Sequence, residues 1–245
     1  MQNEGISERY VDGTYAESNP EFGDDSASWK VAETMEALKR WKIPHQRIAE
    51  VGCGGGAVIA GLAQEVKPEL AVGYEPMPEA YAVAKSRTTE SLSFRNETVT
   101  GDTRADYDLV LCFDVFEHVE DCFTFIRNLT GLSSRILFHI PLDMSVQMVA
   151  RMKPIIGVRE SVGHLHYFSK ETALATLSEC GLNIEGCFYT FGGDAGSHGG
   201  LMYNLMKLPR KLAYRVSKDL TVRFLGGFSL MVYTTVNQGT SDAGS

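Results

Sequence analysis

Apolar and amphipathic stretches alternate along the chain from residue 47 onward. Near-continuous apolar stretches, such as 109–113 and 136–140, are typical of strands that are covered on both faces. Strands that alternate with helices predict right-handed βαβ crossovers and a parallel sheet, with ligands at the carboxyl ends of the strands. The pattern predicts strands at 47–52, 70–75, 95–100, 107–113, 134–140, 183–191 and 228–236, and helices at 57–66, 77–87, 121–130 and 170–180. We therefore expect an α/β fold built on a doubly wound sheet.

The segments that flank or interrupt this alternation carry their own signals. Ser28 is a candidate N-cap for a helix whose periodicity continues until Pro44. Residues 1–28 are polar and acidic, which would suit a disordered leader. We expect an N-terminal segment that ends in a cap helix over residues 1–45, a main domain over 46–236 and a disordered tail over 237–245. Two insertions interrupt the main domain: 144–162, irregular with a short Met-rich helix, and 192–226, which begins with glycines.

A glycine turn joins the first strand to the helix that follows it. Glycine there allows positive φ and lets the backbone approach a ligand closely. Gly52, Gly54 and Ala57 satisfy the dinucleotide-binding spacing. Glu50 argues against a dinucleotide, because its carboxylate would repel a pyrophosphate, whereas it suits the ammonium group of a methionine moiety. Glu75 ends the second strand, roughly 20 residues further on, where a carboxylate accepts hydrogen bonds from both ribose hydroxyls.

This order of an acid, glycines and a second acid resembles motifs I and II of the class I S-adenosylmethionine (SAM)-dependent methyltransferases of the small-molecule type. The resemblance implies a Rossmann-like, mostly parallel sheet of seven strands, with the last strand antiparallel beside the sixth. It also implies SAM as the cofactor and an N-terminal lid over it. Residues 15–30 resemble the "NP…DS.WK" lead-in of a bacterial methyltransferase group.

Later stretches resemble the same family. Asp102 corresponds to the acidic position of motif III, which accepts a hydrogen bond from the adenine amino group, although a turn or cap before Thr103 would also explain it. The stretch 113–121 resembles the "D…hEHv.d" pattern of motif IV, and the stretch from residue 163 resembles "H…FS…L…L…GF". The cofactor-binding residues implied by this resemblance are Glu50, Gly52, Cys53, Gly54, Glu75, Pro76, Asp102, Phe113, Asp114 and His118.

The expected acceptor is a hydroxyl of a small molecule, such as a sugar or a secondary metabolite. The Asn/Asp-Pro-Pro-Tyr signature of amino-methylating nucleic-acid enzymes is absent after the fourth strand, and the net charge of −8 also disfavours nucleic acid. A hydroxyl acceptor needs a base near neutral pH, for which His166 and His139 are the candidates, while His118 is expected to pack against the cofactor. A small-molecule N-methyltransferase, an NAD(P)-binding oxidoreductase and a non-catalytic SAM-binding protein remain alternatives.

The cysteines, the hydropathy and the histidines of the chain bear on its compartment, on membrane binding and on metal binding. The five cysteines are odd in number and form no CxxC pair, which is typical of reduced cysteines in a cytosolic protein. No apolar run is long enough to span a bilayer and no leader-like start is present, so we expect a cytoplasmic protein without a membrane partner. The sequence leaves the oligomeric state open. His164 and His166 are two residues apart and suggest a metal site, but no carboxylate or cysteine completes a recognisable spacing, so no metal is expected.

The segment 201–219 departs from the acidic average of the chain, because it is basic and amphipathic. Three interpretations stay open: a solvated cap helix, a lid whose Tyr203, Lys207 or Arg210 meets a polar acceptor, and a helix that lies on an anionic membrane surface. The glycines at 192–200 and 226–227 flank this segment like hinges and favour the lid.

Overall fold

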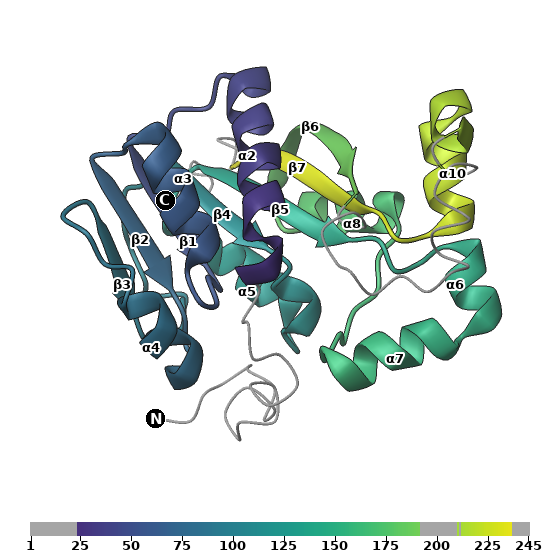
Figure 1. Cartoon of the computed structure of the whole chain (residues 1–245), viewed down its shortest axis with the longest axis horizontal. Helices are drawn as coiled ribbons and strands as arrows, with labels where there is room; N and C mark the ends of the chain where they lie inside the picture. The colour runs from purple at the N-terminus through teal and green to yellow at the C-terminus, as the bar shows by residue number, and fades with distance from the viewer. Residues whose placement is uncertain (1–23, 192–209, 211, 237–245) are drawn as a thin grey trace, which may run out of the picture.

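Seven strands form one open sheet (Figure 1). The computed structural model describes residues 24–191, 210 and 212–236 of the chain. Strand β7 runs antiparallel to both β5 and β6, and the remaining pairs are parallel. The strands, in their spatial order, are β3 (Leu92–Arg95), β2 (Leu70–Tyr74), β1 (Arg47–Val51), β4 (Leu109–Phe113), β5 (Arg135–Pro141), β7 (Ser229–Val236) and β6 (Leu182–Thr190). This confirms the predicted mostly parallel, seven-stranded sheet.

Helices cover both faces of the sheet (Figure 1). On one face pack α2 (Ala27–Trp41), α3 (Ala57–Val66) and α4 (Pro78–Lys85). On the other face pack α5 (Cys122–Leu129) and α8 (Lys170–Glu179). Further helices are η2 (Asp24–Ser26), η3 (Phe116–His118), α6 (Val146–Arg151), α7 (Lys153–Ser161) and α10 (Lys218–Leu225). Strand β4 is buried along its whole length between these two layers, as its continuous apolar sequence predicts.

The third strand lies earlier in the chain than predicted. The sequence favoured 95–100, whereas β3 ends at Arg95 because its partner β2 ends there too, with Tyr74 opposite Arg95. The side-chain amide of Asn96 then donates hydrogen bonds to the carbonyl oxygens of Glu75 and Pro76 (2.8 and 2.9 Å). These bonds turn the chain, so residues 97–101 form a loop at the carboxyl edge of the sheet instead of a strand.

Two helix predictions also change. Ser28 lies inside α2, which begins at Ala27 after the short helix η2, so Ser28 is not the N-cap. The insertion 144–162 is not irregular: it holds α6 and α7. Ser145 starts α6 by accepting a hydrogen bond from the backbone N–H of Met148 (3.3 Å), and Met152, with φ +55°, separates the two helices.

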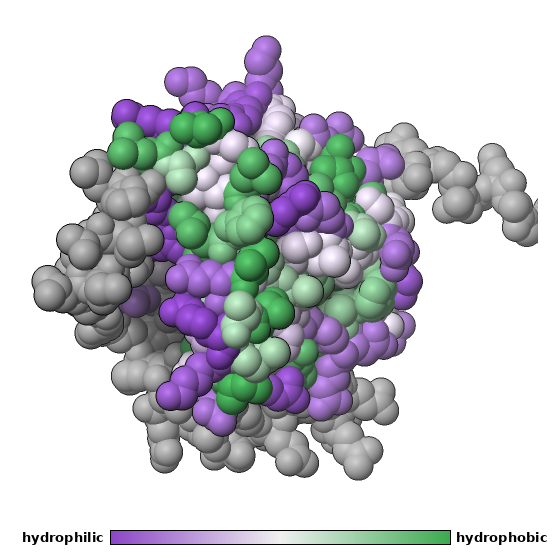
Figure 2. Space-filling view, turned by 90° about the vertical axis from the view of Figure 1, so that its right-hand side faces the viewer, coloured by the Kyte–Doolittle hydropathy of each residue, from purple (hydrophilic) through white to green (hydrophobic). Residues whose placement is uncertain are grey.

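Exposed apolar side chains gather on α6, α7 and α10, the face that Figure 2 turns to the viewer. Helix α10 packs against α6. We call this surface the apolar flank; its members are Met144, Val146, Val149, Met152, Ile156, Leu220 and Phe224. Among the described residues, no helix is long and apolar enough to cross a membrane.

The strand order places a ligand site between β1 and β4. From β1 the chain builds outward through β2 to β3, and from β4 it builds outward in the opposite direction through β5. The loops that leave the carboxyl ends of β1 and β4 therefore diverge, and a crevice opens at this switch point.

Candidate cofactor and acceptor site

A cavity of about 550 Å³ lies at the carboxyl ends of β1, β2 and β4. Its volume falls in the range of small-molecule sites, about 300–1,000 Å³. The loop after β3 forms one wall, and the start of α5 forms another. The lining residues are Val51, Gly52, Tyr74, Glu75, Pro76, Glu97, Thr98, Val99, Thr100, Gly101, Asp114, Val115, His118, Val119, Asp121, Thr124, Phe125 and Asn128.

The glycine turn forms the floor of this cavity next to β1. Gly52 has φ +72°, a conformation that side chains disfavour, and an added Cβ would lie 2.6 Å from Cγ2 of Val115. The backbone N–H groups of Gly52 and Cys53 donate to the carbonyl oxygen of Tyr74 (2.9 and 3.1 Å), so the turn is fixed to the end of β2. The glycine is therefore required at this position, because Val115 packs directly against the backbone of the turn.

Glu75 lines the cavity and also holds the turn. Its Oε2 accepts a hydrogen bond from the backbone N–H of Gly54 (2.8 Å), and its Oε1 accepts one from the N–H of Met77 (2.9 Å). Burial raises the pKa of this carboxyl, while the two N–H groups act in the opposite direction. A carboxylate has about four acceptor positions, so Glu75 keeps capacity for hydroxyl groups of a ligand.

Glu50 lies behind the turn and does not line the cavity. It is 3% exposed, and its Oε2 accepts a hydrogen bond from the backbone N–H of Ile59 in the first turn of α3 (3.0 Å). Burial raises the pKa of Glu50 to about 8, against the lowering effect of the charge on Lys30. Its expected contact with a methionine moiety stays a prediction, because the structure shows this carboxylate bonded to α3.

Asp114 is the charged group on the opposite side of the cavity, just after β4. Its backbone is left-handed, with φ +56°. Lys30 of α2 donates to Oδ2 (2.8 Å), and Nδ1 of His139 donates to Oδ1 (2.7 Å). The other ring nitrogen of His139 lies 2.8 Å from Oγ1 of Thr190. Burial alone would raise the pKa of Asp114, but the charges of His139 and Lys30 outweigh it and lower the pKa.

The structure separates the predicted histidines. His118 lines the cavity, whereas His139 is 2% exposed and reaches the cavity through Asp114. Nε2 of His166 donates to the carbonyl oxygen of Val119 (2.8 Å), and His166 does not line the cavity. This bond ties the loop before α8 to η3, which favours a structural role for His166.

Four other predicted residues stand beside the cavity instead of in its wall. Asp102 is exposed, and its neighbour Gly101 lines the cavity in its place. The Phe113 ring packs edge-on against His139, with 6.0 Å between ring centroids. Cys53 is buried. Gly54 is connected to the cavity through the hydrogen bond that its backbone N–H donates to Glu75. The roles of these residues in cofactor binding stay predictions.

Sequence reasoning missed three residues near the site: Lys30, Glu117 and Asp143. Asp143 accepts a hydrogen bond from Nδ1 of His164 (2.6 Å), and Glu117 is fully buried next to His118. Position was the available signal for the two acids, since Glu117 follows β4 and Asp143 follows β5. Lys30 ends the stretch that resembles the "NP…DS.WK" lead-in, but that resemblance did not indicate its partner Asp114, which is distant in sequence.

A family model described as a methyltransferase domain matches residues 27–185. The match covers more than half of the chain and includes the glycine turn, Glu75 and Asp114. The chain therefore belongs to this family, the class I SAM-dependent methyltransferases.

Curated relatives match a shorter part of the chain. A ubiquinone biosynthesis O-methyltransferase from Vibrio campbellii is 32% identical over 92 residues, which are 36% of this chain and 39% of that protein. A protein of the same name from Yersinia enterocolitica is 34% identical over 87 residues, which are 34% of this chain and 36% of that protein. The matched region thus spans little more than a third of the length of these relatives.

Solved structures share the fold across most of the chain. Magnesium protoporphyrin IX methyltransferase from Synechocystis PCC 6803 with bound S-adenosylhomocysteine has a TM-score of 0.57 at 16% identity and covers 86% of this chain and 84% of that one. An S-adenosylmethionine-dependent methyltransferase from Mesorhizobium loti has a TM-score of 0.54 at 18% identity and covers 82% and 96%. These likenesses confirm the Rossmann-like methyltransferase fold.

SAM is the cofactor of this family, and the cavity suits it. Gly52 and Glu75 both line it, and the oxygens of Glu75 keep acceptor capacity of the kind that ribose hydroxyls use. Thr98 to Gly101 carry no charged side chain and form another part of the wall. The assignment of single residues to parts of the cofactor stays a prediction.

Proposed function

We propose that this chain transfers a methyl group from SAM to a hydroxyl oxygen of a small-molecule acceptor. The observation that carries the proposal is that Asp114, hydrogen bonded to the buried His139, lines the same cavity as Glu75. The names of the curated relatives, which are O-methyltransferases, support the same kind of acceptor.

The cofactor supplies an electrophilic methyl group on a positively charged sulfur when it is bound. The residues of the chain supply position, which accounts for most of the rate enhancement in an in-line displacement. Glu75 and the glycine turn hold one ligand on the β1–β2 side, and Asp114 faces it from the β4 side. An acceptor hydroxyl that donates a hydrogen bond to the Asp114 carboxylate would be oriented by this bond. Such a charge-assisted hydrogen bond also increases the electron density on the hydroxyl oxygen.

His139 acts through Asp114 and is a positioning residue in this proposal. Its Nδ1–H donates to Asp114, while Thr190 contacts its other ring nitrogen, so the ring is held at both ends. The lowered pKa of Asp114 keeps its carboxylate ionised across the neutral range. The aspartate is thus ready as a hydrogen-bond acceptor without a prior proton transfer.

The alternatives are less well supported. An N-methyltransferase does not require an ionised acceptor group beside the amine that attacks the methyl group. The NAD(P)-binding oxidoreductase does not agree with the family match.

The test compares hydroxyl and amine acceptors of the same skeleton, such as a catechol and the corresponding aminophenol, in a methyl-transfer assay. Asn tolerates the left-handed backbone, so Asp114→Asn removes the charge with little strain. We expect kcat with the hydroxyl acceptor to fall about 100-fold or more, with unchanged affinity for S-adenosylhomocysteine. Asp106→Asn, an exposed aspartate, is the matched control.

Methylation of the amine in preference to the hydroxyl would contradict the proposal, and so would full activity of Asp114→Asn. His139→Asn should shift the acid limb of the pH–rate profile as well as lower kcat, because it removes a hydrogen-bond donor that helps to lower the pKa of Asp114. A purely structural role for His139 would lower the amount of folded protein but leave the profile in place.

A further inference from the structure

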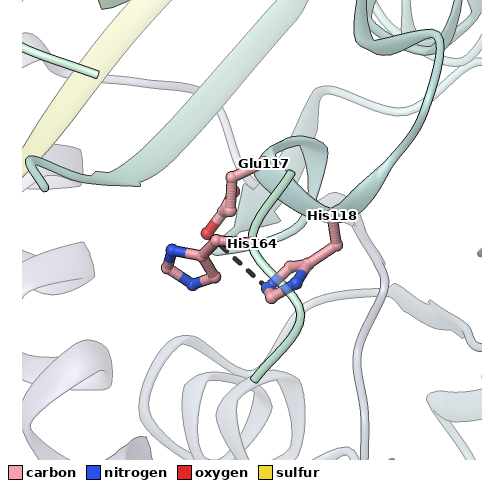
Figure 3. Close-up of side chains that lie close together, drawn as sticks. All are labelled: Glu117, His118 and His164. Carbon is pink, nitrogen blue, oxygen red and sulfur yellow. Dashed lines mark ion pairs between the residues drawn. The ribbon is translucent and has the colours of Figure 1, made fainter. Parts of the chain in front are cut away.

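Three potential metal ligands converge beside the cavity: Glu117, His118 and His164 (Figure 3). Glu117 and His118 belong to η3, and His164 belongs to the loop before α8. One ligand atom from each side chain lies within 4.8 Å of the other two. The two imidazole rings meet edge to face, with 4.7 Å between their centroids.

The carboxylate of Glu117 lacks a hydrogen-bond donor among the described residues. Its side chain is 0% exposed, and neither oxygen accepts a hydrogen bond within the described part of the chain. The nearest cationic candidate is Nε2 of His118, 3.9 Å from Oε1, which is beyond hydrogen-bond distance. A buried ionised carboxylate without a partner is very unfavourable, so this group must either hold a proton or contact a cation that is not part of the chain.

His164 carries the arrangement that metal-binding histidines have. Its Nδ1 donates to Oδ2 of Asp143 at 2.6 Å, which leaves Nε2 with its lone pair available for the cluster. A carboxylate behind a ligand histidine fixes the ring and makes its free nitrogen a better donor to a metal. Backbone bonds from Leu165 and His166 to the carbonyl oxygen of Glu117 (2.8 and 3.0 Å) hold this loop against η3.

We propose that Glu117, His118 and His164 bind a divalent first-row transition-metal ion of the Zn²⁺ type. Two imidazoles and one carboxylate are a ligand set of catalytic zinc sites, in which a fourth position stays open. The same imidazole-rich set disfavours Mg²⁺, which prefers oxygen ligands. The three ligand atoms lie no more than 4.8 Å apart, so an ion placed centrally among them is at most about 2.8 Å from each, and shifts of no more than about 0.7 Å per ligand reach bonding distance.

The position of the cluster gives the ion a role that rests on the proposed function. His118 belongs both to the cluster and to the cavity wall, where Asp114 also lies. The open position of the ion would accept an oxygen of the acceptor molecule and hold it near Asp114. Acceptors with two adjacent oxygens are the class that such an ion would select.

The experiment measures metal binding directly. The full-length chain is stripped with a chelator and titrated with Zn²⁺, Mn²⁺ or Mg²⁺ alone by calorimetry, and Co²⁺ is added to follow its visible absorption. We expect one equivalent of Zn²⁺ and of Co²⁺, with Mg²⁺ at least 100-fold weaker. Glu117→Gln and His164→Ala should each lose this binding, and Asp143→Asn should weaken it by about 10–100-fold. Glu120→Gln and His45→Ala, which lie outside the cluster, are the matched controls.

Thermal unfolding separates a lost ligand from a lost fold. Zn²⁺ should raise the Tm of the wild-type chain but not that of Glu117→Gln. Without metal, Glu117→Gln should be at least as stable as the wild type, because it replaces a buried, unpartnered carboxyl with an uncharged amide. Absence of Zn²⁺ binding in the wild type, or equal binding in the variants, would overturn the proposal. A chain that binds Zn²⁺ but methylates no hydroxyl would instead contradict the proposed function alone.

Discussion

The ammonium group of Lys30 lies 2.8 Å from Oδ2 of Asp114, so that α2 supplies a countercharge to the carboxyl end of β4. The lysine side chain is 12% exposed and the aspartate side chain 28%. Lys30→Met keeps the length of the side chain but leaves Asp114 with the ring of His139 as its remaining side-chain partner. We expect the free energy of unfolding to fall by about 2–4 kcal/mol, because the loss of one partner leaves a desolvated charge behind.

Urea denaturation measures this change, and Lys39→Met, an exposed lysine of the same helix, is the control. The double variant Lys30→Met with Asp114→Asn should be less destabilised than the sum of the two single variants. Additive effects would show that the pair is not energetically coupled.

The raised pKa of Glu50 gives the stability of the protein a specific pH dependence. The unfolded chain releases this proton near pH 4.3, whereas the folded chain holds it until about pH 8. Between these values the folded state binds one more proton, so the free energy of unfolding falls as pH rises from about 5 to 8 and levels off above that.

Glu50→Gln should remove part of this slope while keeping the acceptor for the N–H of Ile59. We expect the variant to gain stability relative to the wild type at pH 8, on the order of a few kcal/mol, and to differ much less at pH 5. Urea denaturation across this pH range measures it, with exposed Glu65→Gln as the control. An unchanged slope would contradict the assigned proton.

Substitution of Glu75 should change the affinity for S-adenosylhomocysteine. Glu75→Ala removes the acceptor oxygens in the cavity and the two bonds that hold the N–H groups of Gly54 and Met77. We expect S-adenosylhomocysteine to bind weaker by about 1–3 kcal/mol in calorimetry, and Glu75→Gln to lose less. Exposed Glu79→Ala is the control. Tight binding of NAD that is insensitive to Glu75→Ala would be incompatible with the assigned site.

The apolar flank makes a prediction about the acceptor side of the enzyme. Its helices α6 and α7 leave the sheet after Asp143 and return at His164, and these two residues are hydrogen bonded to each other. Val149→Ser combined with Ile156→Ser should raise the KM for an apolar acceptor several-fold without a change in SAM affinity. Val216→Ser, an exposed position outside these two helices, is the control. Loss of sedimentation with anionic vesicles at an unchanged KM would instead indicate a membrane-binding surface.

The structure describes only part of the basic segment 201–219. Residues 201–209 and 211 lie outside the described residues, so the proposed lid contacts of Tyr203 and Lys207 stay predictions. Arg210 donates hydrogen bonds to the carbonyl oxygens of Leu225 and Gly226 (both 2.6 Å). This arginine fixes the turn before β7, and its substitution would affect folding before it affected an acceptor.

The sequence was most informative where local pattern and topology determine position. The continuous apolar run of β4 indicated a buried central strand, and parallel topology then placed Gly52, Glu75 and Asp114 at one edge. The third strand was placed too late because apolar positions alone do not tell where pairing ends. Its end depends on β2 and on the side chain of Asn96, which are features of the folded sheet.

The side-chain partners could not be predicted in the same way. Lys30 and Asp114, or Asp143 and His164, meet through tertiary packing of elements that no local periodicity relates. His166 resembled a base by its place in the sequence, yet its ring bonds the backbone of Val119. The direction of a histidine ring depends on neighbours from other elements, and these are known only in the folded chain.

The C-terminal end of α2 has a consequence for the order of folding. Trp41 stacks on Tyr233 of β7 and packs against Phe188 of β6, with 5.6 Å between ring centroids in each case. During synthesis α2 emerges early, whereas these two partners emerge near the end, and contacts between distant parts of a chain form slowly. Helix α2 can therefore make all its packing contacts only after the antiparallel strands β6 and β7 have formed. A nascent chain that stops before residue 229 should leave Trp41 exposed to solvent, which its fluorescence would report.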